Sequence, residues 1–108
     1  FMVRRQLYID LLGFDEKLAV AFNDVDFCLK VRTAKYLIVY NPFVEAYHYE
    51  SKSRGEDTQT PEKQKRFAKE YELFVKRWSK KIAQGDPYYN RNYRLDTDLP
   101  KINYNKIW

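Results

Sequence analysis

Residues 61–84, PEKQKRFAKEYELFVKRWSKKIAQ, are the stretch of sequence that decides the fold. Thr60 and Pro61 suit the N-cap and first turn of a helix. Large apolar residues then recur at steps of three and four, which is the period of one helix face; they are Phe67, Tyr71, Phe74, Val75, Trp78 and Ile82. Gly85 then supplies a stop signal. The spacing predicts one long amphipathic helix over 61–84.

Two shorter helices are expected upstream. Residues 1–12 carry a short apolar pattern that both the helix and the strand period fit loosely; we favour a helix that ends at Gly13. Asn23 is a strong N-cap residue, and acids follow it, so a second helix should run from Asn23 to about Ala34. We expect its apolar face to comprise Val25, Leu29 and Tyr36, with Phe27 and Cys28 beside them.

Strand signals follow the second helix. Residues 36–40, YLIVY, are β-branched and aromatic, and Asn41 and Pro42 close the run. Residues 44–48 alternate apolar and polar side chains, which indicates a second extended stretch. Together these elements predict an α+β fold that is mostly helical, with a short strand pair and one long helix near the C-terminus.

The length of 108 residues allows one compact domain or one piece of a larger one. We expect a single partial domain over 1–108, with an extended tail over 86–108 and a polar loop over 50–60. No apolar run approaches the roughly 20 residues that cross a bilayer. A lone cysteine, Cys28, excludes an internal disulfide and fits a reducing compartment, so we expect a cytoplasmic location.

Acidic residues near two predicted turns are the first candidates for chemistry. Asp15 and Glu16 follow Gly13, and Asp24 and Asp26 lie in the first turn of the second helix. A carboxylate at a helix N-terminus is held by the helix dipole and by unpaired N–H groups, so it can serve as a general base or a metal ligand. The same spacing also suits acids that only cap and solvate a helix.

The second candidate cluster surrounds the single histidine. His48 lies where the predicted strand meets the polar loop, a suitable position for a ligand. The loop continues with hydroxyl and basic side chains that suit phosphate oxygens, namely Ser51, Lys52, Ser53 and Arg54. The same residues are also consistent with a structural, hydrogen-bonded histidine beside an ordinary solvated loop.

The order of these motifs is more specific than any one of them. The chain carries Arg4-Arg5, Gly13-Phe14-Asp15-Glu16, Phe22-Asn23-Asp24-Val25-Asp26-Phe27-Cys28-Leu29, the run from Tyr36 to Pro42, the run from His48 to Gly55, Arg77-Trp78, and the run from Asp86 to Asn90. In this order and spacing the chain resembles the C-terminal, acceptor-side part of family 2 glycosyltransferases of the GT-A type. The likeness covers Phe1 to about Leu95.

The resemblance implies roles for the candidate residues. Asp24 would be the catalytic base that deprotonates the acceptor hydroxyl, with inversion at the anomeric carbon, and Asp26 a supporting acid. His48 would complete a site for a divalent metal, Mg or Mn, or for the diphosphate. Residues 51–54 would form the loop over the donor, and Asp15 and Glu16 would lie on the acceptor side.

The resemblance also implies partners. The nucleotide-sugar donor would bind mainly to an N-terminal half that these 108 residues lack, and the acceptor would be a glycan or polysaccharide. We therefore expect the isolated chain to be inactive and to form a homo-oligomer through the apolar surface that the missing half would cover.

The charge of +5 and the pI near 9.3 leave other function classes open. The basic residues of 61–84 suit a solvated face or one that lies near the inner face of an anionic membrane. They also suit a nucleic-acid-binding module, and the apolar stripe suits a helix-mediated interaction domain. The nucleic-acid alternative leaves the order of the motifs unexplained, so we expect no nucleic-acid partner. For the apolar stripe we favour the core of the domain itself over a partner chain.

Overall fold

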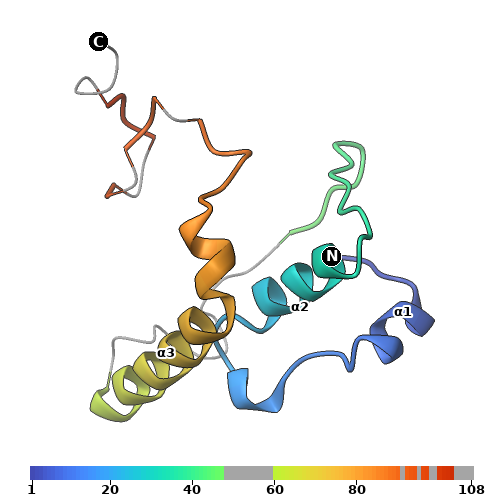
Figure 1. Cartoon of the computed structure of the whole chain (residues 1–108). Coiled ribbons are helices and arrows are strands. Elements are labelled where there is room, and N and C mark those ends of the chain that lie inside the picture. The colour runs from blue at the N-terminus through green and yellow to red at the C-terminus, as the bar shows by residue number, and fades with distance from the viewer. Residues whose placement is uncertain (48–59, 91, 95, 98–99, 104–108) are drawn as a thin grey trace. The chain divides into compact units, whose positions relative to one another are not determined.

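A computed structural model of the chain describes residues 1–47, 60–90, 92–94, 96–97 and 100–103. Its elements are α1 (Arg5–Asp10), the short 3₁₀ helix η1 (Glu16–Leu18), α2 (Asn23–Thr33) and α3 (Pro61–Ala83), as Figure 1 shows. The chain divides into two compact units, Phe1–Arg77 and Trp78–Trp108, which are described separately. The described residues are mostly helical, as predicted.

The long helix predicted over 61–84 is confirmed as α3, Pro61–Ala83. The Lys63 N–H donates to Thr60 Oγ1 over 3.3 Å, so Thr60 caps the first turn. Glu62 in the first turn and basic residues in the last turn complement the helix dipole. After the helix, Gly85 adopts a φ of +72°, and its N–H donates to Ile82 O over 3.0 Å. Local signals at both ends therefore account for the extent of α3.

The first helix is confirmed as α1, but it ends at Asp10, three residues before the predicted stop at Gly13. α1 ends at Asp10, and the chain then passes through positive φ at Leu12 (61°) and Gly13 (56°). The Gly13 N–H donates to Tyr8 O over 2.8 Å. A Cβ on Gly13 would lie 2.6 Å from Cε1 of the Tyr8 ring. Both the backbone conformation and the close ring therefore require glycine at this position.

The second helix is confirmed, but its N-cap was predicted wrongly. Asn23 is the first helical residue of α2, and Phe22 takes the cap position with a left-handed φ of 64°. The Phe22 ring lies 5.1–6.0 Å, between centroids, from three aromatic rings on α3. Those rings belong to Phe67, Tyr71 and Phe74. A left-handed non-glycine residue costs about 1–2 kcal/mol, and this aromatic packing offsets that cost.

The buried face of α2 also differs from the prediction. Phe27 and Val31 are buried, four residues apart, whereas Val25 is 46% exposed. Phe27 packs against three other rings at centroid distances of 5.1–5.9 Å, those of Phe1, Tyr8 and Phe14. The apolar residues of α2 are spread around the helix, so the sequence period alone does not identify the buried side.

The predicted strand pair is wrong for the residues that the structure describes. Residues 36–40 and 44–47 belong to no strand, and the one bridge among the described residues joins Tyr93 to Ile102 in the second unit. Lys35 has a φ of 68°, and the Tyr36 N–H donates to Val31 O, which closes α2. High β propensity makes a strand only where a neighbouring strand completes the hydrogen-bond ladder, and no described segment does so for these residues. His48, at the end of the second predicted stretch, lies outside the described residues.

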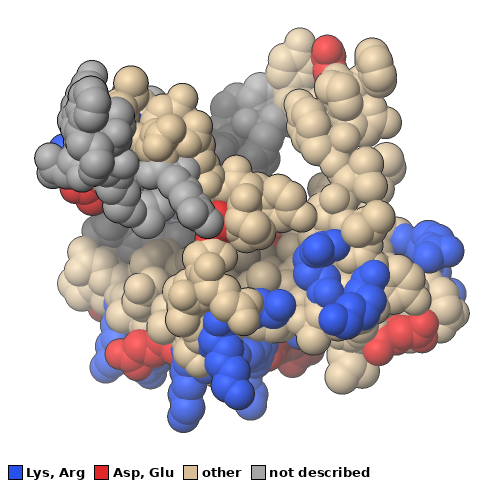
Figure 2. Space-filling model, turned by 45° about the horizontal axis from the view of Figure 1, so that its top comes forward, with Lys and Arg blue, Asp and Glu red and all other residues tan. Residues whose placement is uncertain are grey.

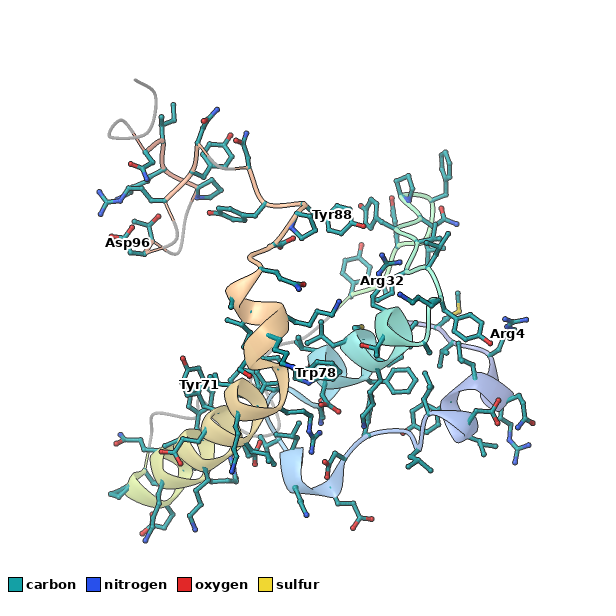
Figure 3. All side chains as sticks on the ribbon, viewed as in Figure 1. Arg4, Arg32, Tyr71, Trp78, Tyr88 and Asp96 are labelled. Atoms are coloured by element: carbon teal, nitrogen blue, oxygen red, sulfur yellow. The ribbon has the colours of Figure 1, made fainter. Side chains whose placement is uncertain are left out.

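The second unit contains the end of α3 and the tail. In the described part of 86–103, the Arg94 N–H donates to Lys101 O over 2.8 Å, and the Asn103 N–H donates to Asn92 O over 2.6 Å. Asp96, labelled in Figure 3, accepts both hydrogen bonds of the Arg94 guanidinium. Apart from this antiparallel closure, the described residues of the tail belong to no helix or strand. No helix in the described residues is long and apolar enough to span a bilayer.

Candidate functional site

The candidate site in the first unit is built around Arg77 of α3. Its Nη1 donates to Asp26 Oδ1 over 2.8 Å, and its Nη2 donates to Asp15 Oδ2 over 2.5 Å. One guanidinium therefore joins the loop after Gly13 to the first turn of α2. Arg77 is 62 residues from Asp15 in sequence and 51 residues from Asp26. The planar fork of arginine suits two carboxylates at once in a way that a lysine ammonium does not.

Asp26 is the buried centre of this network. Its side chain is 0% exposed, and its Oδ2 lies 2.9 Å from Lys30 Nζ one turn along α2. Lys30 Nζ also donates to Gly13 O over 3.2 Å. Two carboxylates and two cations thus balance in charge, which is the condition under which a carboxylate can remain buried.

The network shifts the pKa values of its partly exposed members, Asp15 and Arg77. The Lys17 N–H and the Arg77 guanidinium donate to Asp15 and hold the pKa of that carboxyl below its ordinary value. Hydrogen bonds to Asp26 and then to Asp15 raise the pKa of Arg77. Both shifts favour the charged forms, so the pairing is present at neutral pH.

A second buried carboxylate holds the loop that leads into α2. Glu70 is 4% exposed, and its Oε2 accepts hydrogen bonds from the Val20 N–H (3.2 Å) and the Ala21 N–H (2.6 Å). Arg66 Nε lies 3.8 Å from the other oxygen. The loop ends at Phe22, so Glu70 and the aromatic contacts of Phe22 together fix where α2 begins.

The sequence prediction missed Glu70 and the bridging role of Arg77. A signal for both was present, because Glu70, Phe74 and Arg77 are spaced by four and three residues and therefore share one helix face. An acid and an arginine on an apolar stripe are exceptions to the amphipathic pattern. Such exceptions indicate buried partners from elsewhere in the chain.

Asp24 lies apart from this network, although it is only two residues from Asp26. It is exposed in the first turn of α2, and its Oδ1 accepts a hydrogen bond from the Val25 N–H over 2.8 Å. Its own N–H donates to Asn23 Oδ1 over 2.7 Å. The carboxylate is therefore open to solvent at the positive end of an eleven-residue helix.

The other predicted residues fall into two groups. Asp15 is joined to Asp26 through Arg77 and caps η1 through the Lys17 N–H, and Glu16 is exposed in η1. His48 and residues 51–54 lie outside the described residues, so the expected metal and diphosphate positions lie there as well. Within the described ranges, no three His, Cys, Asp or Glu side chains are grouped to hold a metal ion.

The charged surface mixes both signs. Figure 2 shows acidic side chains in red interspersed among the basic side chains in blue. On α3, Glu62 and Glu72 alternate with basic residues along the exposed side. This interleaving is the pattern expected of a solvated helix face.

Comparison with known proteins identifies an uncharacterized relative and shows no family. Neither a protein-family model nor a solved structure matches the chain. Over 96 residues, or 88% of this chain, the sequence is 44% identical to a Sinorhizobium fredii (strain NBRC 101917 / NGR234) protein described as uncharacterized protein y4gI. The matched segment is 10% of that protein, so the chain spans about a tenth of the length of this relative.

Proposed function

We propose that the chain is the acceptor-side part of a family 2 glycosyltransferase of the GT-A type. The observation that supports this most is the convergence on Arg77 of motifs that carry the resemblance. The segments Gly13–Glu16 and Asn23–Asp26 lie far apart from Arg77 in sequence, yet Asp15 and Asp26 pair with it directly. Residues that recur together in a motif and also bind one another are expected to shape one site.

In this proposal Asp26 is a structural acid and Asp24 is the reactive one. Asp26, fully buried and paired with Arg77 and Lys30, holds the first turn of α2 in place. Asp24 in the same turn keeps an exposed carboxylate. We assign Asp24 as the general base, because a base must reach the acceptor proton while its own backbone is held rigid.

The proposed reaction is sugar transfer with inversion. The acceptor hydroxyl oxygen forms a bond to the anomeric carbon of the donor, the bond from that carbon to the diphosphate oxygen breaks, and Asp24 takes the hydroxyl proton. A bound Mg²⁺ or Mn²⁺ would neutralise charge on the departing nucleoside diphosphate. In this proposal His48 and residues 51–54 contact that group, and Asp15 and Glu16 line the acceptor side.

The proposal requires a nucleotide-sugar-binding half elsewhere in the polypeptide. The glycan acceptor would be extended in the cytoplasm, at the inner face of the membrane, and the charged side of α3 would lie in solvent. The 108 residues alone are expected to bind the donor weakly and to transfer no sugar.

The test uses a polypeptide in which this chain follows a nucleotide-sugar-binding half. Sugar transfer is measured by the release of nucleoside diphosphate from the nucleotide sugar. Asp24→Asn should lower the transfer rate by at least about 100-fold, the lower end of the contribution of a general base, with donor binding unchanged. Glu62→Gln is the matched control, because Glu62 is also an exposed acid in the first turn of a helix. Equal transfer rates for the two variants would refute the assignment of Asp24, and absence of any sugar transfer would refute the function.

A further inference from the structure

The residues after α2 form an apolar surface of unusual extent, here called the 36–47 surface. Its sequence, YLIVYNPFVEAY, has one charged residue, Glu45. Tyr40 is 87% exposed, and Phe43 and Tyr47 are each 92% exposed. Large apolar side chains that lie this close together on a surface usually mark an interaction site.

Part of the backbone of this segment, residues 37–40, has no hydrogen-bond partner among the described residues. Arg32, labelled in Figure 3, donates from Nη1 to Tyr36 O over 3.1 Å. From Leu37 to Tyr40, no backbone hydrogen bond forms with any described residue. Exposure alternates over the first four positions, at 43, 77, 54 and 79% for Tyr36, Leu37, Ile38 and Val39. Such alternation is typical of a strand that has one face against its own molecule.

An apolar hollow lies beside the segment in the same unit. It has a volume of about 870 Å³ and is bounded by the first residues of the chain, by the Phe27 and Val31 side of α2, and by the 36–47 surface. Among the described residues of its lining, Arg4 is the one that carries a charge. A lining with so little charge favours an apolar partner.

We propose that the 36–47 surface is a self-association interface, in which residues 36–40 of two copies pair as antiparallel strands about a two-fold axis at Ile38. In this register Leu37 faces the partner's Val39, Tyr36 faces the partner's Tyr40, and Ile38 faces the partner's Ile38. Every cross-strand pair is then apolar or aromatic, and no like charges meet. The interface is isologous and closes as a dimer.

The exposed area is sufficient for a stable dimer. Tyr40, Phe43 and Tyr47 expose about nine-tenths of side chains that each carry about 150–250 Å². With the other exposed apolar side chains of the segment, each copy offers on the order of 800 Å². A standard specific interface buries about 800 Å² on each partner. A second copy of the chain therefore matches the surface in area, in charge and in strand register.

Sedimentation velocity of the 108-residue chain over a range of concentrations tests the proposal. The chain should sediment as a monomer–dimer equilibrium, and Leu37→Lys should raise the dissociation constant at least about tenfold, because two cross-strand pairs are lost. Leu12→Lys is the matched control, since Leu12 is 86% exposed outside this surface, and it should leave the equilibrium unchanged. A strictly monomeric chain, open-ended aggregates, or equal effects of the two variants would overturn the proposal.

Cross-linking tests the register without relying on a destabilising charge. In a Cys28→Ser background, Ile38→Cys should form an intermolecular disulfide readily, because residues directly opposite in an antiparallel pair lie about 4.5–5.5 Å apart between Cα atoms. Val39→Cys, one residue along, should cross-link much more slowly, because its counterpart is displaced by two positions. Equal rates for positions 38 and 39 would overturn the two-fold register.

Discussion

Replacing Arg77 with methionine removes the one cation that two carboxylates of the site share. Asp26 is fully buried and keeps Lys30, at 2.9 Å, as a counter-ion. Breaking a buried ion pair costs about 3–5 kcal/mol. Because Lys30 remains and Arg77 is itself 28% exposed, we expect the lower end of that range, about 3 kcal/mol. The partly exposed pair with Asp15 adds at most about 1 kcal/mol.

The assay is urea unfolding followed by circular dichroism, at a protein concentration below that of dimerisation. For a slope of about 1.5 kcal/mol per molar urea, a loss of 3 kcal/mol lowers the midpoint by about 2 M. The urea midpoint of Arg77→Lys should lie between those of the unsubstituted chain and Arg77→Met, because an ammonium keeps the charge but does not bridge two carboxylates. Lys76→Met, which removes a charge from an exposed neighbouring position, should change stability by less than about 0.5 kcal/mol. Equal midpoints for Arg77→Met and Lys76→Met would refute the structural role of the network.

Three further predictions concern other contacts of the first unit. Glu70→Ala should cost about 2–4 kcal/mol in urea unfolding, because two backbone N–H groups lose their acceptor, whereas Glu70→Gln keeps an acceptor and should cost about half as much. Gly13→Ala should lower the melting temperature more than Gly85→Ala, since both have positive φ but only Gly13 faces a ring; equal losses would contradict this. Because the pKa of Asp15 is lowered in the folded chain, this residue stabilises the fold at pH values above its ordinary pKa of 3.8, and that stability is lost as the pH falls through the folded pKa. Asp15→Asn should therefore reduce the difference in unfolding free energy between pH 5 and pH 3. An unchanged difference would count against the Arg77 pairing.

The helices were predictable because their signals are local. Thr60 and Pro61 start α3, the three- and four-residue spacing extends it, and Gly85 ends it, all within one stretch of sequence. Gly13 likewise marks the end of the first helix through its own backbone conformation. Each of these features depends on residues no more than a few positions away.

The buried charge network and the absence of a strand at residues 36–40 depend on residues that are distant in sequence. Asp26 looks like one more capping acid until Arg77, 51 residues away, is known to reach it. Glu70 looks like a solvated acid until the backbone at Ala21 is known to donate to it, 49 residues away. Residues 36–40 have strand propensity but no ladder, because propensity describes a segment whereas a strand requires a neighbour.

The most direct test of the account separates two acids that lie two residues apart. In the polypeptide that joins this chain to a donor-binding half, sugar transfer and urea stability are measured for Asp24→Asn and Asp26→Asn. Asp24→Asn should lower the transfer rate at least about 100-fold at unchanged stability, whereas Asp26→Asn should lower the unfolding midpoint, because it removes a buried charge that Arg77 and Lys30 neutralise. Full transfer by Asp24→Asn, or unchanged stability of Asp26→Asn, would contradict the account.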